Sequence, residues 1–255
     1  MRKIFFICLM LISGSSFAGT KDTTLSGDLN HDNILDRVTV SFVTNDGMYS
    51  YLAGDFSVNI NGAVYKDKCA EAEVFDVKIV SIEPDDMLPV VMVSCFAVGD
   101  VGEYFFYKYK SKEVVPLGSI KLWGSVEIPG NGKILTNDFM GFWTLHGEYI
   151  VDKENGKLVP VKKDTYDIDD VEGTVKTSFK ILKSRDDKSD VVENLKPGTK
   201  FSLLKCDISP VCKNEAGYDD EYECDWYLLK TANGTQGWVR LKDFRENVAD
   251  LPWAG

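Results

Sequence analysis

The feature that most constrains the fold of this 255-residue chain is the near-absence of helical periodicity. Short apolar and β-branched runs take its place, separated at close intervals by turn signals such as Asn61-Gly62. The clearest runs are Arg37–Val43, Phe56–Ile60, Phe75–Ile82, Val90–Phe96, Tyr104–Tyr109, Tyr149–Val151 and Lys157–Val161. We therefore expect an all-β fold, with a sandwich or a propeller-like sheet in the N-terminal part. Tyr104-Phe105-Phe106-Tyr107 is apolar at every position, which predicts a central strand packed on both faces.

Residues 1–18 have the pattern of an export signal. Arg2 and Lys3 precede the apolar run Ile4–Ile12, and Ser16-Phe17-Ala18 is typical of a cleavage site before Gly19. The run is shorter than the roughly 20 residues that cross a bilayer, and no later segment is long and apolar enough to do so. We expect a periplasmic or secreted protein with no membrane span in its mature chain.

The charge is acidic and uneven. The whole chain carries −11, and residues 19–172 hold 14 Lys/Arg against 26 Asp/Glu, a net charge of −12. Residues 173–255 hold 13 against 14, a net charge of −1. Nucleic acid is excluded as an expected partner because phosphate binding needs clustered positive charge. The acidic part would favour encounter with a basic protein.

Five cysteines follow the signal, and an oxidising compartment permits them to form disulfides. Cys69 and Cys95 are the natural pair of the first domain, and two of Cys206, Cys212 and Cys224 are expected to pair in the second. The odd number leaves at least one thiol free or paired between chains. No Cys-x-x-Cys is present, which disfavours redox chemistry and zinc.

The acidic stretch Lys163–Gly173 lacks a clear apolar face and predicts a linker. The expected organisation is a signal at 1–18, a β-domain at 19–162, the linker at 163–173 and a second domain at 174–248. A single continuous fold is the alternative.

Residues 28–36 predict a calcium loop. Asp28, Asn30, Asp32 and Asp36 stand at places 1, 3, 5 and 9, and Ile34 at place 7 would offer its backbone carbonyl. Ca²⁺ takes six to eight oxygen ligands, which this set and water could supply. The pattern resembles the calcium loops of FG-GAP and VCBS repeats, which implies a structural ion in a propeller-type β-domain. The chain departs from that family at His31 and at Asn33, where the family has Gly, but Asn tolerates a left-handed backbone. An acidic turn without an ion is the alternative.

The tail has the motifs of a small β-barrel. Asn194-Leu195-Lys196-Pro197-Gly198-Thr199-Lys200 is followed by Trp226-Tyr227-Leu228-Leu229-Lys230, the turn Asn233-Gly234 and then Gly237-Trp238-Val239-Arg240. These segments resemble a bacterial SH3 domain over about seventy residues. The resemblance implies an SH3-like barrel that binds peptidoglycan or an envelope protein.

The resemblance also implies a groove beside aromatic residues. Trp226, Tyr227, Tyr218 and Tyr222 are the candidate ligand contacts. A core role is the alternative for Trp226, and the favoured one for Trp238. The acidic and aromatic insertion that contains Tyr218 and Tyr222 lies between Cys212 and Cys224, and a disulfide there would hold it as a rigid flap.

Catalytic motifs are missing from the sequence. The only histidines are His31, in the predicted calcium loop, and His146, which no motif surrounds. An acid pair such as Asp138 with Glu148 is a remaining alternative that no pattern singles out. We expect a non-enzymatic exported protein that binds the cell envelope. The alternative is a periplasmic inhibitor or immunity protein against a lysozyme-like or other basic cell-wall hydrolase, because the loop and architecture resemble a group of periplasmic lysozyme-type inhibitors.

Overall fold

The computed structural model describes residues 19–44, 52–70, 72–83, 89–97, 101–210, 212–213, 219–220 and 222–252. The predicted signal at 1–18 and Tyr218 lie outside these residues. Within them the regular secondary structure is almost entirely antiparallel strand, which confirms the all-β prediction. None of the described sheets closes into a barrel. No described helix is long and apolar enough to cross a membrane.

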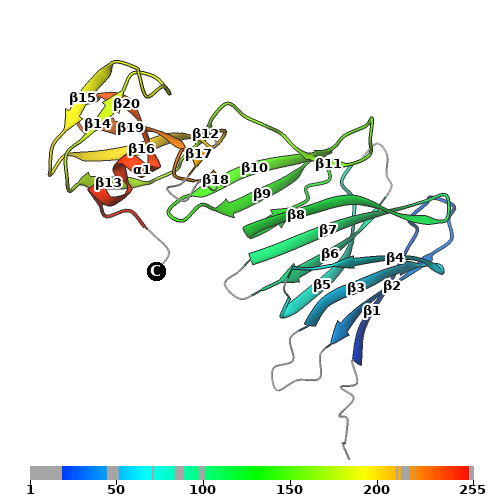
Figure 1. The fold of residues 1–255 in the computed structure, drawn as a ribbon. Coiled ribbons are helices and arrows are strands. Elements are labelled where there is room, and N and C mark those ends of the chain that lie inside the picture. The colour runs from blue at the N-terminus through cyan, green and yellow to red at the C-terminus, as the bar shows by residue number, and fades with distance from the viewer. Residues whose placement is uncertain are drawn as a thin grey trace, which may run out of the picture.

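Two sheets form the sheet unit, which comprises β1 to β11 (Figure 1). The four-stranded sheet contains β1 (Gly19–Gly27), β2 (Asp36–Thr44), β3 (Leu52–Ile60) and β4 (Ala63–Lys68) in chain order. The seven-stranded sheet contains β5 (Val74–Val80), β6 (Val90–Phe96), β7 (Val101–Lys110), β8 (Glu113–Glu127), β9 (Ile134–Phe139), β10 (Thr144–Val151) and β11 (Leu158–Pro160). Every neighbour along each sheet is also a neighbour along the chain.

The two sheets pack face to face because alternate side chains of their strands are apolar. Val38, Val40 and Phe42 of β2 share one buried cluster with Val91 and Val93 of β6. The opposite face of β6 and β7 is also buried, in a second cluster. Phe105 and Tyr107 belong to the first cluster, and Tyr104 and Phe106 to the second, which confirms the prediction of a strand packed on both faces.

Strand β8 changes partner along its length. Its first part pairs with β7, and Gly124–Glu127 pairs with β9. Gly124 has φ +150°, and a Cβ there would lie 2.1 Å from the carbonyl oxygen of Asn137, so only glycine permits this close approach. The sheet therefore continues past β8 into the β9–β10 hairpin, which leads towards the tail.

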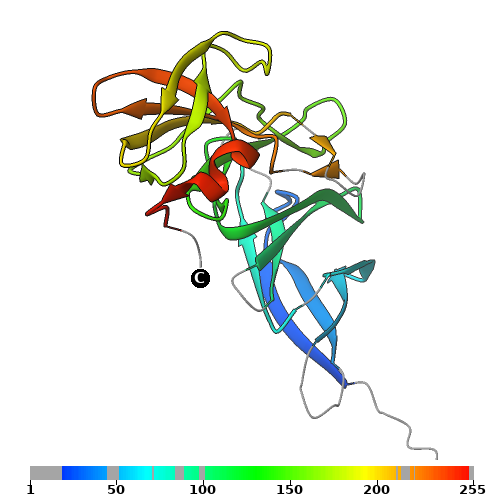
Figure 2. The same cartoon turned by 60° about the vertical axis from the view of Figure 1, so that its left-hand side comes forward.

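The tail unit comprises β12 to β21, α1 and η1, and lies at the far end from the four-stranded sheet (Figures 1 and 2). The strands of its sheet are, in sheet order, β15 (Val191–Leu195), β14 (Phe179–Leu182), β20 (Gln236–Arg240), β19 (Trp226–Thr231), β16 (Lys200–Asp207), β13 (Glu172–Val175) and β21 (Val248–Ala249), with β12 (Tyr166–Asp167) also paired to β16. The remaining elements are β17 (Cys212–Lys213), β18 (Asp219–Asp220), α1 (Leu241–Phe244) and η1 (Arg245–Asn247). The predicted Asn-Gly hairpin is present as β19 and β20, with Gly234 at φ +93°.

The acidic segment 163–173 does more than connect the two units. Tyr166 and Asp167 form β12, Glu172 begins β13, and Ile168 and Val171 are buried in the tail core. Phe142 and Trp143, from the β9–β10 connection, are buried in that same core. The tail core therefore takes side chains from both units.

Candidate functional site

The loop predicted to bind calcium is held by its own side-chain oxygens. Asp28 accepts hydrogen bonds from the amides of Asp32 (3.2 Å) and Asn33 (2.9 Å), and Asp32 accepts one from Ile34 (2.8 Å). Asn33 has φ 64°, the left-handed conformation that its residue type tolerates. Burial alone would raise the pKa of Asp28, but backbone hydrogen bonds, the first of them from Asn33, hold it below its ordinary value.

The side-chain oxygens of this loop are of the kind that bind a cation, but they are not arranged around a common centre. No group of three or more His, Cys, Asp or Glu residues has a metal-holding arrangement among the residues that the structure describes. Asp36 is buried, accepts the amide of Leu29 at 2.7 Å and accepts a hydrogen bond from Asn61. Each carboxylate has about four lone-pair directions, so the hydrogen bonds leave capacity for an ion at Asp28 and Asp32.

The aromatic residues predicted as ligand contacts separate into two groups. Trp226 and Tyr227 are 2% and 1% exposed, so neither offers a ring face to a ligand. Tyr227 accepts a buried hydrogen bond from Trp143 Nε1 at 3.2 Å and packs against Phe142 and Phe244. Tyr222 is 53% exposed, and it is the predicted contact that the structure places at a surface.

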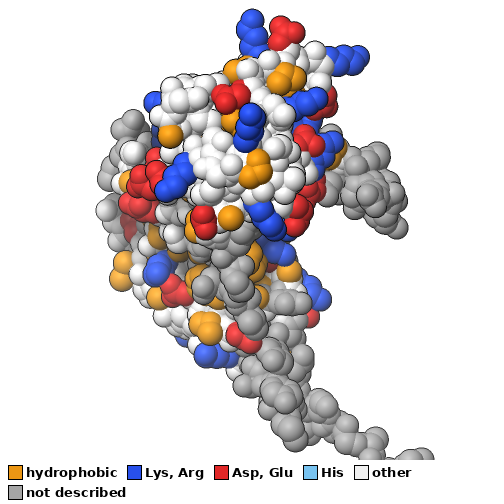
Figure 3. Space-filling model, turned by 90° about the vertical axis from the view of Figure 1, so that its left-hand side faces the viewer, with side chains coloured by type: hydrophobic (Ala, Val, Ile, Leu, Met, Phe, Trp, Pro, Cys, Tyr) orange, Lys and Arg blue, Asp and Glu red, His pale blue; other side chains and the backbone are white. Residues whose placement is uncertain are grey.

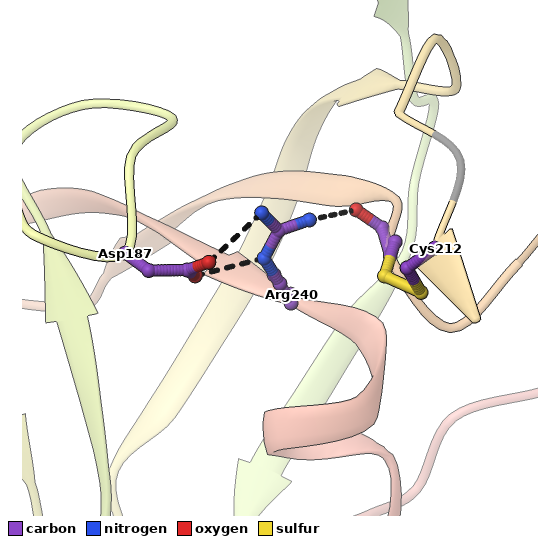
Figure 4. The surroundings of a disulfide bond; sticks show 4 residues. Asp187, Cys212 and Arg240 are labelled. Atoms are coloured by element: carbon purple, nitrogen blue, oxygen red, sulfur yellow. Dashed lines mark hydrogen bonds and ion pairs between the residues drawn. A yellow bond between two sulfur atoms is a disulfide. The ribbon is translucent and has the colours of Figure 1, made fainter. Parts of the chain in front are cut away.

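The cysteines form the pairs Cys69–Cys95 and Cys212–Cys224, and Cys206 is a buried free thiol. Burial raises the pKa of Cys206, which keeps it a neutral thiol. Arg240 fixes the second disulfide in place (Figure 4): its guanidinium donates to Asp187 at 2.8 Å and to the Cys224 carbonyl at 2.7 Å. The same group lies 4.2 Å from the ring centroid of Trp226. Arg240 therefore contacts three parts of the tail unit: Asp187, the Cys212–Cys224 disulfide and the ring of Trp226.

A cavity of about 390 Å³ opens where the two units meet, and we name it the junction cleft. Strands β8, β9 and β10 supply one wall, and the tail unit supplies the other through Tyr166, Ile208, Pro210 and Tyr222. Asp138 and Tyr149 are among the polar residues of the first wall. The lining mixes apolar and polar side chains, and a concave site at the boundary of two units is a common place for ligand binding.

Two acidic residues of the cleft have opposite environments. Asp138 accepts the amide of Trp123 at 2.7 Å, but burial outweighs that bond and raises its pKa. Glu148 forms ion pairs with Lys133 (2.6 Å) and Lys163 (3.1 Å), and these hydrogen bonds lower its pKa. Burial raises the pKa of Tyr149, and the nearby charge of Asp138 raises it further.

The outer face of the same three strands carries a second group of residues, which we name the Trp123 face. Trp123, 43% exposed, lies edge-to-face with Phe139 at 5.6 Å. In the next cross-strand row, Asn137 lies between Ser125 (3.4 Å) and His146 (2.7 Å). An aromatic row beside a row of hydrogen-bonding groups suits a sugar ring, whose faces are apolar and whose edges carry hydroxyl groups.

Sequence reasoning named Asp138, Glu148 and Tyr222 but missed Tyr149, Tyr166 and Trp123. The alternation of buried and exposed residues along β8 to β10 could have placed Trp123 and Tyr149 on opposite faces. Nothing in the sequence could have shown that Tyr166 lies across the cleft. Comparison of the chain with protein-family models, with curated proteins and with solved structures finds no match.

Proposed function

We propose that this chain is an exported, non-enzymatic protein that binds the bacterial cell envelope, with peptidoglycan as its ligand. The observation that carries the proposal is the junction cleft, where Tyr149, Tyr166 and Tyr222 line the same cavity as the half-buried carboxylate of Asp138. Two disulfides support an oxidising compartment and therefore export. The proposal includes an SH3-like character for the tail unit, supported by the β19–β20 hairpin, and a structural calcium ion at residues 28–36.

The Trp123 face supports a polysaccharide ligand. It lies on the opposite face of the strands that form the cleft, and it would give the polymer a second place of contact. The charges of the tail unit are mixed in sign: Figure 3 shows acidic and basic side chains interspersed over its outer face. A surface of that kind does not select for or against a polymer by net charge.

The test is co-sedimentation of the mature chain, Gly19 onward, with purified peptidoglycan sacculi. We expect the protein to pellet, and we expect Tyr222→Ala and Trp123→Ala each to weaken pelleting, because both side chains are exposed. Val64→Ala is the matched control, since Val64 is 55% exposed but belongs to β4 of the four-stranded sheet and does not line the cleft, whose strands belong to the seven-stranded sheet. No pelleting by the intact mature chain would refute the proposal.

A second function, inhibition of a basic cell-wall hydrolase, is favoured by the net charge of −12 on residues 19–172. It predicts that the protein slows lysis by a lysozyme-like enzyme and that added salt weakens the effect. Lysis at an unchanged rate with excess protein at low salt would refute this second function.

A further inference from the structure

We infer that the junction cleft binds a cationic amino group and that Asp138 is its counter-ion. The inference rests on the proposed function and makes it specific, since the diamino acid in peptidoglycan stem peptides carries a side-chain ammonium. The ligand class for the cleft is therefore the amino-bearing peptide of the polymer, while the Trp123 face contacts its sugar.

Asp138 is a half-buried carboxylate in the wall of the cleft. Its Oδ1 accepts the amide of Trp123 at 2.7 Å, and over the described residues no Lys, Arg or His forms an ion pair with it. A half-buried carboxylate without a countercharge costs free energy, as its raised pKa indicates. A ligand ammonium would supply the missing positive charge and offset part of this free-energy cost.

Aromatic side chains also line the cleft. Tyr149 is close enough to Asp138 for the carboxylate charge to raise the pKa of its phenol, and Tyr166 also affects that phenol. Aromatic rings beside a carboxylate stabilise an ammonium through cation–π contacts. Lys163 already lies 5.8 Å from the centroid of the Tyr166 ring, which shows that a cation is accommodated there.

The other charged groups of the cleft do not neutralise Asp138. Lys133 and Lys163 are both held by Glu148. Lys121 alternates with the buried Ile120 and Leu122, so its side chain starts from the opposite face of β8. Asp225, at the tail wall, is buried and adds a third acidic residue to the lining, after Asp138 and Glu148. Asp138 is therefore the carboxylate that a ligand cation would meet.

The experiment is an NMR titration of the mature chain with Nα-acetyl-L-lysine methylamide, and with the norleucine analogue as an uncharged probe of equal length. We expect the lysine probe alone to shift amide resonances of residues that line the cleft. Asp138→Asn keeps an oxygen that can accept the Trp123 amide, and it should lower the affinity for the lysine probe at least tenfold. Asp76→Asn is the matched control, because Asp76 also accepts a backbone amide, at 2.9 Å, but lies on β5. Equal binding of both probes, or an unchanged affinity in Asp138→Asn, would overturn the inference.

A soluble muropeptide with a free side-chain amine, compared with the same muropeptide after N-acetylation, identifies the source of the cation. Weaker binding after acetylation supports the peptide, whereas capture of a basic lysozyme with no muropeptide binding overturns that assignment. The two proposals fail separately. If sacculi pellet wild type and Asp138→Asn equally, the envelope function stands and the counter-ion does not. If the lysine probe binds the cleft but the protein does not pellet with sacculi, the counter-ion role stands and the envelope function does not.

Discussion

The sheet unit and the tail unit differ in how far each is self-contained. Among the residues that the structure describes, the core between the two sheets takes its side chains from the range between Leu25 and Val114. The core of the tail unit includes Phe142, Trp143 and Leu145, which belong to the β9–β10 hairpin of the other unit. The difference teaches that a boundary drawn from composition near residue 170 does not mark where one core ends and the next begins.

The largest expected effect comes from cutting the chain at that boundary. A fragment of residues 163–255 lacks Phe142 and Trp143, so its core would have a gap where two large aromatic side chains pack. We expect it to show no cooperative thermal unfolding, whereas a fragment that begins before β9, at residue 113, should unfold cooperatively. A sharp unfolding transition for residues 163–255 alone would contradict the comparison.

Trp143→Ala in the full chain should destabilise the tail unit by about 3–5 kcal/mol, the usual range for removing a buried aromatic side chain. The change also removes the indole that donates to Tyr227. Trp123→Ala is the control, because Trp123 is 43% exposed on the same sheet and should cost about 1 kcal/mol or less. Denaturant unfolding followed by near-UV circular dichroism measures both. Similar losses for the two tryptophans would show that the hairpin does not complete the tail core.

Calcium should act on the sheet unit alone. At a free concentration ten times the dissociation constant, an ion at Asp28 and Asp32 would stabilise the folded state by about 1.4 kcal/mol. Asp28→Asn should abolish this gain, while Asp186→Asn, in the tail unit, should leave it intact. The readout is the thermal midpoint with calcium and with chelator, and an equal midpoint in the two conditions would refute the ion.

The smallest effect concerns Asp138, at the junction of the two units. Burial raises the pKa of folded Asp138 above the ordinary value of 3.8. Between pH 3.8 and that folded pKa, the folded state therefore binds more protons than the unfolded state. Stability should therefore fall as the pH rises from about 3.8 through the folded pKa. Asp138→Asn removes this decline and should be more stable relative to wild type at about pH 7 than at about pH 3. Denaturant midpoints at the two pH values measure the change. The opposite sign would mean that Asp138 has a countercharge in solution.

Much of the fold could be predicted from the sequence because local patterns determine it. Alternating apolar residues placed the strands, Asn233-Gly234 placed the hairpin, and Cys69 with Cys95 were paired as expected. The role of Trp226 and Tyr227 could not be decided in this way, since an aromatic residue on a strand has the same pattern whether its face meets a core or a ligand. Burial by Phe142 and Phe244 decides it for Tyr227, and those contacts lie far apart in the sequence. The cleft was unpredictable for the same reason, because its two walls belong to different units.

The insertion of the β9–β10 tip into the tail core has a mechanical consequence. A two-part protein that is pulled at one end extends first at its weakest connection. A bare linker between the units would extend first and leave the tail to rotate freely. Phe142 and Trp143 are buried in the tail core and belong to the connection between β9 and β10, two strands of a continuous hydrogen-bonded sheet. Tension on the tail unit therefore acts on β8 to β10 before the segment between the units extends.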